Sequence, residues 1–436
     1  MNETPTAEDE VVELCHDLIR IDTTNTGATQ TSAGERVAAE YVADKLAEVG
    51  LEPIVLESEP TRTSVVARIP GADPSRGALL IHGHLDVVPA DPAEWSVHPF
   101  AGEERDGYLW GRGAIDMKDM DAMTLALARQ WQREGRRPPR DVVLAFVADE
   151  EAGGGKGARW LVDNHPGLFE GCTEAISEVG GFSVTVRDDL RLYLIQTAEK
   201  GLAWLRLRAQ ARPGHGSMVH EDNAVTMLAE AVTRLGRHRF PLVVTDTVRA
   251  FLDGVSEALG VDLDPADPAM PDRLGTISRM IGAGLRNTVN PTMLSAGYKA
   301  NVIPGTAEAV VDGRFLPGQE AEFDKQLSEL IGPAIEREWL VHDQALETPF
   351  DGPLVDAMGA ALRAEDPHAH PVPYLMSGGT DGKSFARLGM RCFGFSPLLL
   401  PPDLDFAALF HGIDERVPIE GLKFGVRVLD RLVMAS

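Results

Sequence analysis

Two nearly continuous apolar runs stand out in the first 150 residues: GALLIHGHLDVVP at 77–89 and DVVLAFVADE at 141–150. Such runs suit central strands that are buried on both faces of a sheet. A shorter strand-like run, SVVARIP, precedes them at 64–70, and a helical stretch, DAMTLALARQWQREG, separates them at 121–135. The order strand, helix, strand predicts an α/β fold with a mixed or parallel sheet flanked by helices.

Two helices are expected before these strands. The first, VVELCHDLIRI at 11–21, has apolar residues spaced to bury one face. The second is expected over 32–50, where Ser32 followed by Glu35 forms a capping-box pattern and Gly50 ends the periodic stretch.

After about residue 197 the pattern changes, and AWLRLRAQA at 203–211 alternates apolar with polar residues as in a strand with one wet face. A chain of 436 residues also exceeds one ordinary core. The later segments predict a β-α-β-β-α-β order, which is the ferredoxin-like, split βαβ arrangement. These later segments are a helix at 223–236, strands at 292–304 and 307–317, a helix at 320–335 and a strand at 340–347.

We therefore expect a first domain formed by 1–197 and 351–436 and an inserted domain formed by 198–350. The stretch 237–290, with scattered Pro, Asp and Gly, allows no interpretation from its sequence.

Composition and charge exclude several classes of function. Hydrophobic residues make up 44% and charged residues 25% of the chain, as in a soluble globular protein, and no run of 18 apolar residues predicts a membrane span. The net charge of −26 disfavours nucleic acid and anionic membranes as partners. The acidic start, MNETPTAEDE, does not resemble a secretory signal, so we expect a cytoplasmic protein.

Three scattered cysteines, Cys15, Cys172 and Cys392, predict neither a disulfide framework nor a thiolate zinc site. Each is interpreted as a small buried hydrophobic residue.

His84 and Asp86 follow the first apolar run. If both lie on a strand, their side chains share a face, and Asp86 can accept a hydrogen bond from one imidazole nitrogen while the other nitrogen binds a metal. Taken alone, His84 is better explained as a structural histidine than as a metal ligand. His82 lies further inside the strand and is interpreted as structural.

Asp116 lies within GRGAIDMKDM, where Gly111 and Gly113 permit an unusual backbone just before it. A helix is expected to begin there, so Asp116 by itself could be an N-cap. The neighbouring motifs favour a functional role.

Further carboxylates follow the second apolar run at Asp149, Glu150 and Glu151. Their mutual repulsion needs cations, protons or water to offset it, and a solvated loop is the alternative. Glu178 follows another short apolar run, and His411 lies in a turn containing glycine. Ligands with nitrogen and oxygen atoms and no cysteine suit zinc or another divalent ion in a hydrolytic centre.

Four motifs, GHLDVVP, GRGAIDMKD, DEEAGG and HGIDERV, resemble those of the two-zinc peptidase family that contains aminoacylases, glutamate carboxypeptidase and succinyl-diaminopimelate desuccinylase. The resemblance covers nearly the whole chain. It implies a zinc-peptidase catalytic domain interrupted by a lid or dimerisation domain, two Zn²⁺ ions with Co²⁺ or Mn²⁺ as alternatives, and a homodimer. Asp119 stands where the family commonly has glycine, a departure that removes no ligand.

Carried onto matching positions, the resemblance implies that Asp116 bridges the two ions. His84 and Glu178 would complete one site, and Glu151 and His411 would complete the other.

The same resemblance implies that Glu150 is the general base, that Asp86 orients the histidine beside it, and that the Asp116–Met117 bond is cis. His215, in ARPGHGSM, resembles the histidine that stabilises the oxyanion, often from a partner subunit; an ordinary loop histidine is the alternative.

Substrate capture is expected from Asn301 and Arg314, and from the loop of Gly378, Gly379 and Thr380. Arginine can clamp a carboxylate with two hydrogen bonds, and exposed backbone N–H groups can also bind one. The alternatives are a surface ion pair for Arg314 and a plain helix-entry turn for the loop.

These roles predict a hydrolase that cleaves an amide next to a free carboxylate, in an N-acyl amino acid, a dipeptide or a peptide C-terminus. One alternative is a deacylase of a biosynthetic intermediate of the acetylornithine or succinyl-diaminopimelate type. Another is an inactive metal-binding relative, against which the presence of Glu150 argues.

Overall fold

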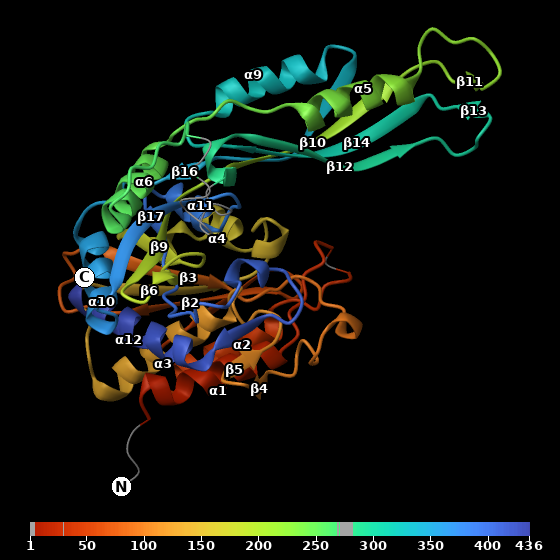
Figure 1. Ribbon diagram of the computed structural model, residues 1–436. Helices are drawn as coiled ribbons and strands as arrows, with labels where there is room; N and C mark the ends of the chain where they lie inside the picture. Colours follow the sequence, from red (N-terminus) through yellow and green to blue (C-terminus); the bar gives the residue numbers. More distant parts are fainter. Residues whose placement is uncertain (1–4, 29, 268–269, 271–281) are drawn as a thin grey trace. The chain divides into compact units, whose positions relative to one another are not determined.

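The structure is a computed structural model, and it describes residues 5–28, 30–267, 270 and 282–436. The chain divides into two compact units, which Figure 1 shows. Unit 1 consists of Met1–Thr197, Thr348–Tyr374 and Thr380–Ser436, and unit 2 of Ala198–Glu347 and Leu375–Gly379.

Unit 1 is built on a large mixed sheet. Its strands are β1 (Ile54–Glu59), β2 (Arg62–Ile69), β3 (Ala78–His84), β6 (Val142–Val147), β7 (Cys172–Ser177), β8 (Phe182–Arg187), β9 (Leu190–Glu199), β17 (Ala369–Met376) and β18 (Arg391–Gly394). The order is β1-β2-β6-β3-β7-β18-β9, and β8 and β17 also pair with β9. Strand β3 is parallel to β6 and β7, whereas β2 is antiparallel to β1 and β6.

Helices cover both faces of this sheet (Figure 1). On one face α1, α3, α10 and α12 pack on one another, and α2 packs on α3 and β2; α4 and α11 pack together on the other face. The α/β class with a mixed sheet flanked by helices is therefore confirmed. The helices are α1 (Ala7–Arg20), α2 (Arg36–Ala47), α3 (Lys118–Glu134), α4 (Ala158–Asn164), α10 (Pro353–Glu365), α11 (Gly382–Ala386) and α12 (Ile419–Ala435).

Both central strands behave as their sequences predict, since every residue of β3 and β6 is buried. A small sheet and several 3₁₀ turns complete unit 1 within the residues that the structure describes. These are β4 (Glu103–Arg105), β5 (Tyr108–Trp110) and β19 (Arg416–Pro418), with turns at Pro92–Glu94, Glu150–Ala152, Pro166–Phe169 and Phe406–Ala408.

The expected capping box at Ser32 is wrong. Helix α2 begins at Arg36 with Glu35 as its N-cap residue, and no side chain caps it. The side chains of Ser32 and Glu35 instead accept hydrogen bonds from Arg62, which donates to Glu35 Oε1 at 2.5 Å and to Ser32 Oγ at 3.0 Å. The Ser32 hydroxyl and the Glu35 carboxylate therefore bind a buried guanidinium and do not form the helix cap that the local pattern predicts.

Unit 2 contains a four-stranded antiparallel sheet in the order β12-β14-β10-β15. Its elements follow the β-α-β-β-α-β order along the chain. They are β10 (Gly201–Gln210), α5 (Ala224–Arg237), β12 (Thr288–Ala296), β14 (Thr306–Phe315), α9 (Glu320–Ile331) and β15 (Ile335–Asp343). Alternate residues of β10, such as Leu205 and Leu207, are buried in a core that they share with residues of α5 and α9. Both helices lie over one face of this sheet (Figure 1).

Shorter elements of unit 2 refine the predicted strands. The run expected at 292–304 is the end of β12 followed by a separate short strand, and the run expected at 340–347 is divided between β15 and β16. Helix α6 lies in the uninterpreted stretch 237–290, of which 268–269 and 271–281 are outside the described residues. The short elements are β11 (Gly214–His215), β13 (Val302–Ile303), β16 (Leu346–Glu347), α6 (Asp246–Leu259) and a 3₁₀ turn at Ala283–Leu285.

Among the residues that the structure describes, no helix has both the length and the apolar character needed to cross a membrane.

Candidate metal centre

The parallel strands of unit 1 bring several candidate residues to one edge of the sheet. His84 is the last residue of β3, where it pairs with Val147 of β6. Glu150 and Glu151 follow β6, and Glu178 follows β7. Because parallel strands end at the same edge, residues that are far apart in the sequence meet there.

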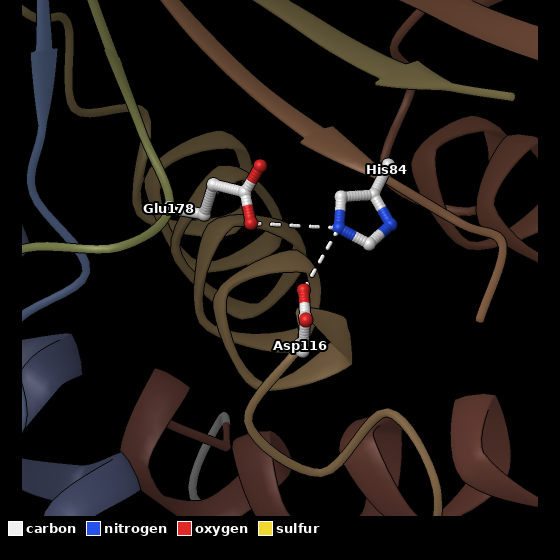
Figure 2. Close-up of side chains that lie close together, drawn as sticks. All are labelled: His84, Asp116 and Glu178. Atoms are coloured by element: carbon white, nitrogen blue, oxygen red, sulfur yellow. Dashed lines mark hydrogen bonds and ion pairs between the residues drawn. The ribbon is translucent and has the colours of Figure 1, made fainter. Parts of the chain in front are cut away.

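One cluster consists of His84, Asp116 and Glu178, all of them buried (Figure 2). His84 Nε2 lies 3.0 Å from Asp116 Oδ1 and 3.5 Å from Glu178 Oε2. Asp116 reaches this place from the loop before α3, and its bond to Met117 is cis, as the resemblance implies.

The second cluster consists of Asp116, Glu151 and His411. His411 Nε2 lies 3.1 Å from Asp116 Oδ2 and 3.2 Å from Glu151 Oε2. The two oxygens of Asp116 therefore face different histidines. The His411 side chain is 56% exposed, whereas that of His84 is only 1% exposed.

The donor atoms fit a divalent cation in each cluster. Two ligand atoms about 2 Å from a tetrahedral zinc ion lie roughly 3.3 Å from each other. The imidazole–carboxylate distances of 3.0–3.5 Å in both clusters are close to that spacing. Histidine nitrogens and carboxylate oxygens are also the ligands expected of a hydrolytic zinc site.

Burial and mutual contacts shift the pKa values of these groups. Burial would raise the pKa of Asp116, but hydrogen bonds from His411 and His84 lower it below its usual value. Burial raises the pKa of Glu151 to about 7, assisted by the charge of Asp116. Burial also raises the pKa of Glu178. The carboxylates thus form a concentrated, desolvated negative site that a cation would stabilise.

The two histidines differ in how their pKa values are shifted. Burial would lower the pKa of His84, but the charge of Glu178 and the hydrogen bond to Asp116 raise it well above its usual value. Hydrogen bonds to Asp116 and Glu151 raise the pKa of His411 to about 10. In the absence of metal, both imidazoles therefore take positive charge that a bound metal would supply instead.

Glu150 belongs to neither cluster and lies at the start of the 3₁₀ turn that also carries Glu151. Burial, followed by the charge of Glu178, raises its pKa well above the usual value. A carboxylate with a raised pKa is suited to accept and return a proton near neutral pH.

Asp86 has other partners than the sequence suggested. Strand β3 ends at His84, and the His84 Nδ1–H group donates to the backbone oxygen of Asp86 at 2.9 Å; the carboxylate Oδ1 lies 3.7 Å away. Because a carbonyl only accepts, this bond leaves Nε2 free as a ligand atom. The Asp86 carboxylate instead accepts the backbone N–H groups of Glu150 and Glu151, each at 3.1 Å.

The sequence reasoning missed a buried ion pair between Arg112 and Glu415, whose Nη1–Oε2 distance is 2.6 Å. Arg112 Nη2 also donates to the backbone oxygen of Gly412 at 2.9 Å, and Glu415 Oε1 accepts the N–H of Ile115 at 2.8 Å. The pair thus ties the loop of His411 to the loop before Asp116. Both residues lie inside the quoted motifs, which was the available signal.

Other residues of unit 1 that the sequence singled out are buried and belong to neither cluster. Burial lowers the pKa of His82 to about 3, and its ring lies 4.6 Å from that of Phe385. Asp119 is also buried, at 2% exposure. The three cysteines form no disulfide and are buried, as expected.

The remaining candidates belong mainly to unit 2. His215 pairs with Val302 between β11 and β13, and the N–H of the next residue, Gly216, donates to the backbone oxygen of Asn301 at 3.0 Å. His215 and Asn301 are therefore neighbours within unit 2. Arg314 forms two hydrogen bonds with Asp312, at 2.7 and 3.2 Å.

The glycine loop lies at the boundary of the units. Gly378 and Gly379 fall in unit 2 and Thr380 in unit 1, where Thr380 Oγ1 accepts the N–H of Gly382 at 3.1 Å as α11 begins. Both clusters lie in unit 1, so the substrate-binding roles of the unit 2 residues stay predictions.

A mixed-sheet α/β unit with two histidine–carboxylate clusters that share one aspartate has the arrangement expected of a metal-dependent hydrolase. Residues 80–435 match the model of peptidase family M20/M25/M40, and the chain belongs to this family. The members related to this chain are hydrolytic enzymes, so the chain is assigned to the same class.

Two curated relatives match almost the whole chain. N-fatty-acyl-amino acid synthase/hydrolase PM20D1 of Xenopus tropicalis is 28% identical, over 98% of this chain and 86% of its own length. Human aminoacylase-1 is 27% identical, over 99% of this chain and 96% of its own.

Solved structures share the fold. An M20 family metallo-carboxypeptidase, Sso-CP2 from Sulfolobus solfataricus, has a TM-score of 0.73 at 17% identity, covering 98% of this chain and 99% of its own. Human carnosine dipeptidase 1 has a TM-score of 0.69 at 16% identity, with 98% and 96% covered.

Proposed function

We propose that this protein cleaves the amide bond of N-acyl amino acids, dipeptides or peptide C-termini with the help of two zinc ions. The observation that carries the proposal is the sharing of Asp116, whose Oδ1 and Oδ2 face His84 and His411 at 3.0 and 3.1 Å. Two ions held by one bridging carboxylate are a recurrent arrangement for hydrolysis at a carbonyl.

The ions would be held by His84, Asp116 and Glu178 in one site and by Asp116, Glu151 and His411 in the other. When bound, such ions lower the pKa of a water molecule and polarise the scissile carbonyl. Zinc is proposed first because each site contains a histidine. Carboxylate-rich sites also accept Co²⁺ or Mn²⁺, which are the alternatives.

Glu150 would act as the general base. It lies one residue from the ligand Glu151 but is outside both clusters, so its carboxylate is free for proton transfer. Its raised pKa favours taking a proton from water and passing it to the leaving amine nitrogen. Asp86, which binds the backbone of this turn, would orient the base rather than share in the chemistry.

N-acyl amino acids are the substrates that we propose first, because the names of both curated relatives concern acylated amino acids. The substrate carboxylate would be recognised by Arg314, Asn301 and the loop of Gly378, Gly379 and Thr380. For Arg314 this requires release from Asp312. His215 would stabilise the oxyanion, supplied by the partner subunit of a homodimer.

The test is to measure bound zinc and the hydrolysis of a panel of N-acyl amino acids, dipeptides, acetylornithine and succinyl-diaminopimelate. Glu150→Gln should keep both ions and lose roughly a hundred- to ten-thousandfold in kcat. Glu104→Gln, at an exposed glutamate, is the matched control and should change neither. A native protein that binds two zinc ions but hydrolyses no panel member would contradict the proposal.

A further inference from the structure

The turn that carries Glu150 and Glu151 has to hold two adjacent carboxylates for different tasks, if the proposed function is correct. It is a single 3₁₀ turn, and Asp149 before it has a positive φ of 70°. Both N–H groups of the pair donate to one carboxylate, with Glu150 N at 3.1 Å from Asp86 Oδ1 and Glu151 N at 3.1 Å from Asp86 Oδ2. The orientation of Asp86 therefore sets both peptide planes.

Asn25 is a side-chain donor to that carboxylate. Its Nδ2 lies 2.8 Å from Asp86 Oδ2 and 3.2 Å from Asp149 Oδ1, so both amide hydrogens are used on carboxylates that flank the turn. Asn25 is 4% exposed, and its backbone N–H donates to the oxygen of Val87 at 2.8 Å. The amide is therefore fixed to the chain segment that carries Asp86.

Arg62 orients this amide together with two other donors. The backbone N–H of Gly27 donates to Asn25 Oδ1 at 2.9 Å, and the hydroxyl of Ser32 donates to it at 3.3 Å. Arg62 Nη2 donates to Asn25 Oδ1 at 2.7 Å, and its Nη1 donates to Glu35 Oε1 at 2.5 Å. A guanidinium only donates hydrogen bonds, so the amide oxygen must face Arg62 and the amide NH₂ must face the carboxylates. Arg62 and Glu35 are both fully buried, at 0% exposure, and belong to the start of β2 and the N-cap of α2.

We infer that Asn25, oriented by Arg62, is a positioning residue for the Glu150–Glu151 turn. A reversed or missing amide would remove the donors that hold Asp86 and Asp149 beside the turn. The proposed base and the proposed ligand would then lose their fixed directions together. The inference rests on the proposed function for its catalytic meaning, but the hydrogen-bond chain itself is independent of it.

The substitution Asn25→Asp tests this role, because it keeps the size of the side chain and replaces both donors by an acceptor. Partners behind metal ligands commonly contribute about 10–100-fold in activity or metal affinity, and we expect a loss of kcat of that size with KM unchanged. Zinc affinity should fall for the cluster of Asp116, Glu151 and His411 and stay unchanged for the cluster of His84, Asp116 and Glu178.

Arg62→Lys is the second variant, because it keeps the charge and loses the planar fork. It should show the same selective losses as Asn25→Asp, although smaller. Two matched controls carry the same chemical changes elsewhere in unit 1. Asn164→Asp changes an exposed amide that donates to Trp160, and Arg68→Lys changes an exposed arginine of β2 that pairs with Asp141 at 2.8 Å. Both should behave like the native protein.

Hydrogen exchange of the metal-free protein provides a measurement that does not depend on activity. In Asn25→Asp and Arg62→Lys, amide exchange of a peptide covering 149–153 should be faster than in the native protein, while peptides from β6 stay unchanged. Native exchange and native kcat in a folded Arg62→Lys or Asn25→Asp would overturn the inference. An inactive native protein with the faster exchange in both variants would contradict only the proposed function.

Discussion

The two clusters that share Asp116 differ mainly in their access to water. His84 and Glu178 have side chains only 1% and 8% exposed, whereas the His411 side chain is 56% exposed. His84 ends a fully buried strand, but His411 lies in an irregular loop with a positive φ of 56°. The structure therefore combines a buried cluster with a second cluster in which the histidine is half exposed.

This difference suggests a division of labour within the proposed centre. A dry site holds charges without screening, so its ion would be retained and would mainly organise the site. In the proposed centre, an incoming substrate would reach an ion from the side on which His411 is exposed. Asp116 couples the two clusters, because both histidines contact its carboxylate and a change at either one affects it.

Removing the shared carboxylate should abolish metal binding at both clusters. In Asp116→Asn we expect loss of both ions and a fall in kcat/KM of roughly a thousandfold or more, since metal ions stabilise such transition states by several kcal/mol. Metal analysis and kinetics check this. Asp163→Asn, at an exposed residue paired with Arg387, is the control. A variant that kept one ion and high activity would contradict the sharing.

The second prediction concerns stability without metal. His84→Asn leaves buried Asp116 and Glu178 without their cationic partner, and breaking such a buried pair costs about 3 kcal/mol or more. His411→Asn should cost less than about 1 kcal/mol, because solvent screens a half-exposed pair. Denaturant unfolding of the two metal-free variants measures the difference. Equal losses would show that the clusters do not differ in the way that their exposure indicates.

The smallest expected effect is a pH dependence in the metal-free protein. The pKa of His411 is raised from 6.5 to about 10, so the folded state binds its proton more tightly than the unfolded state. The stability from this proton is complete below pH 6.5 and is lost as the pH rises towards 10. His411→Asn should remove that part of the decline, which unfolding at several pH values would show. A histidine NMR titration near 6.5 would contradict it.

The fold class could be predicted because strands buried on both faces have nearly continuous apolar sequences, as in β3 and β6. The five residues named from the motifs lie together in two clusters, although their binding of metal stays a prediction. The partners of Asp86 could not be predicted, because they depend on where β3 ends. Asn25 and Arg62 were also missed, since nothing local marks side chains that meet only after β2 and the first loop have packed.

Ser32 and Glu35 show the opposite error. Their spacing is that of a capping box, but Arg62, which lies further along the chain, recruits both side chains. The capping-box pattern failed here because it does not include Arg62, the buried charge that binds both side chains. Polar contacts between residues far apart in the sequence are the part of the site that is hardest to predict from one sequence.

The loop held by the ion pair between Arg112 and Glu415 comes late in the chain, which affects the order in which the two clusters can form during synthesis. The two residues are separated by 303 positions, and the loop that they hold includes His411. During synthesis, the cluster of His84, Asp116 and Glu178 has all its residues once Glu178 has emerged from the ribosome. The other cluster waits until the whole of unit 2 has been translated. A nascent chain that has passed Glu178 therefore lacks only His411 of the five residues in the two clusters, and the second cluster is completed after unit 2 has been translated.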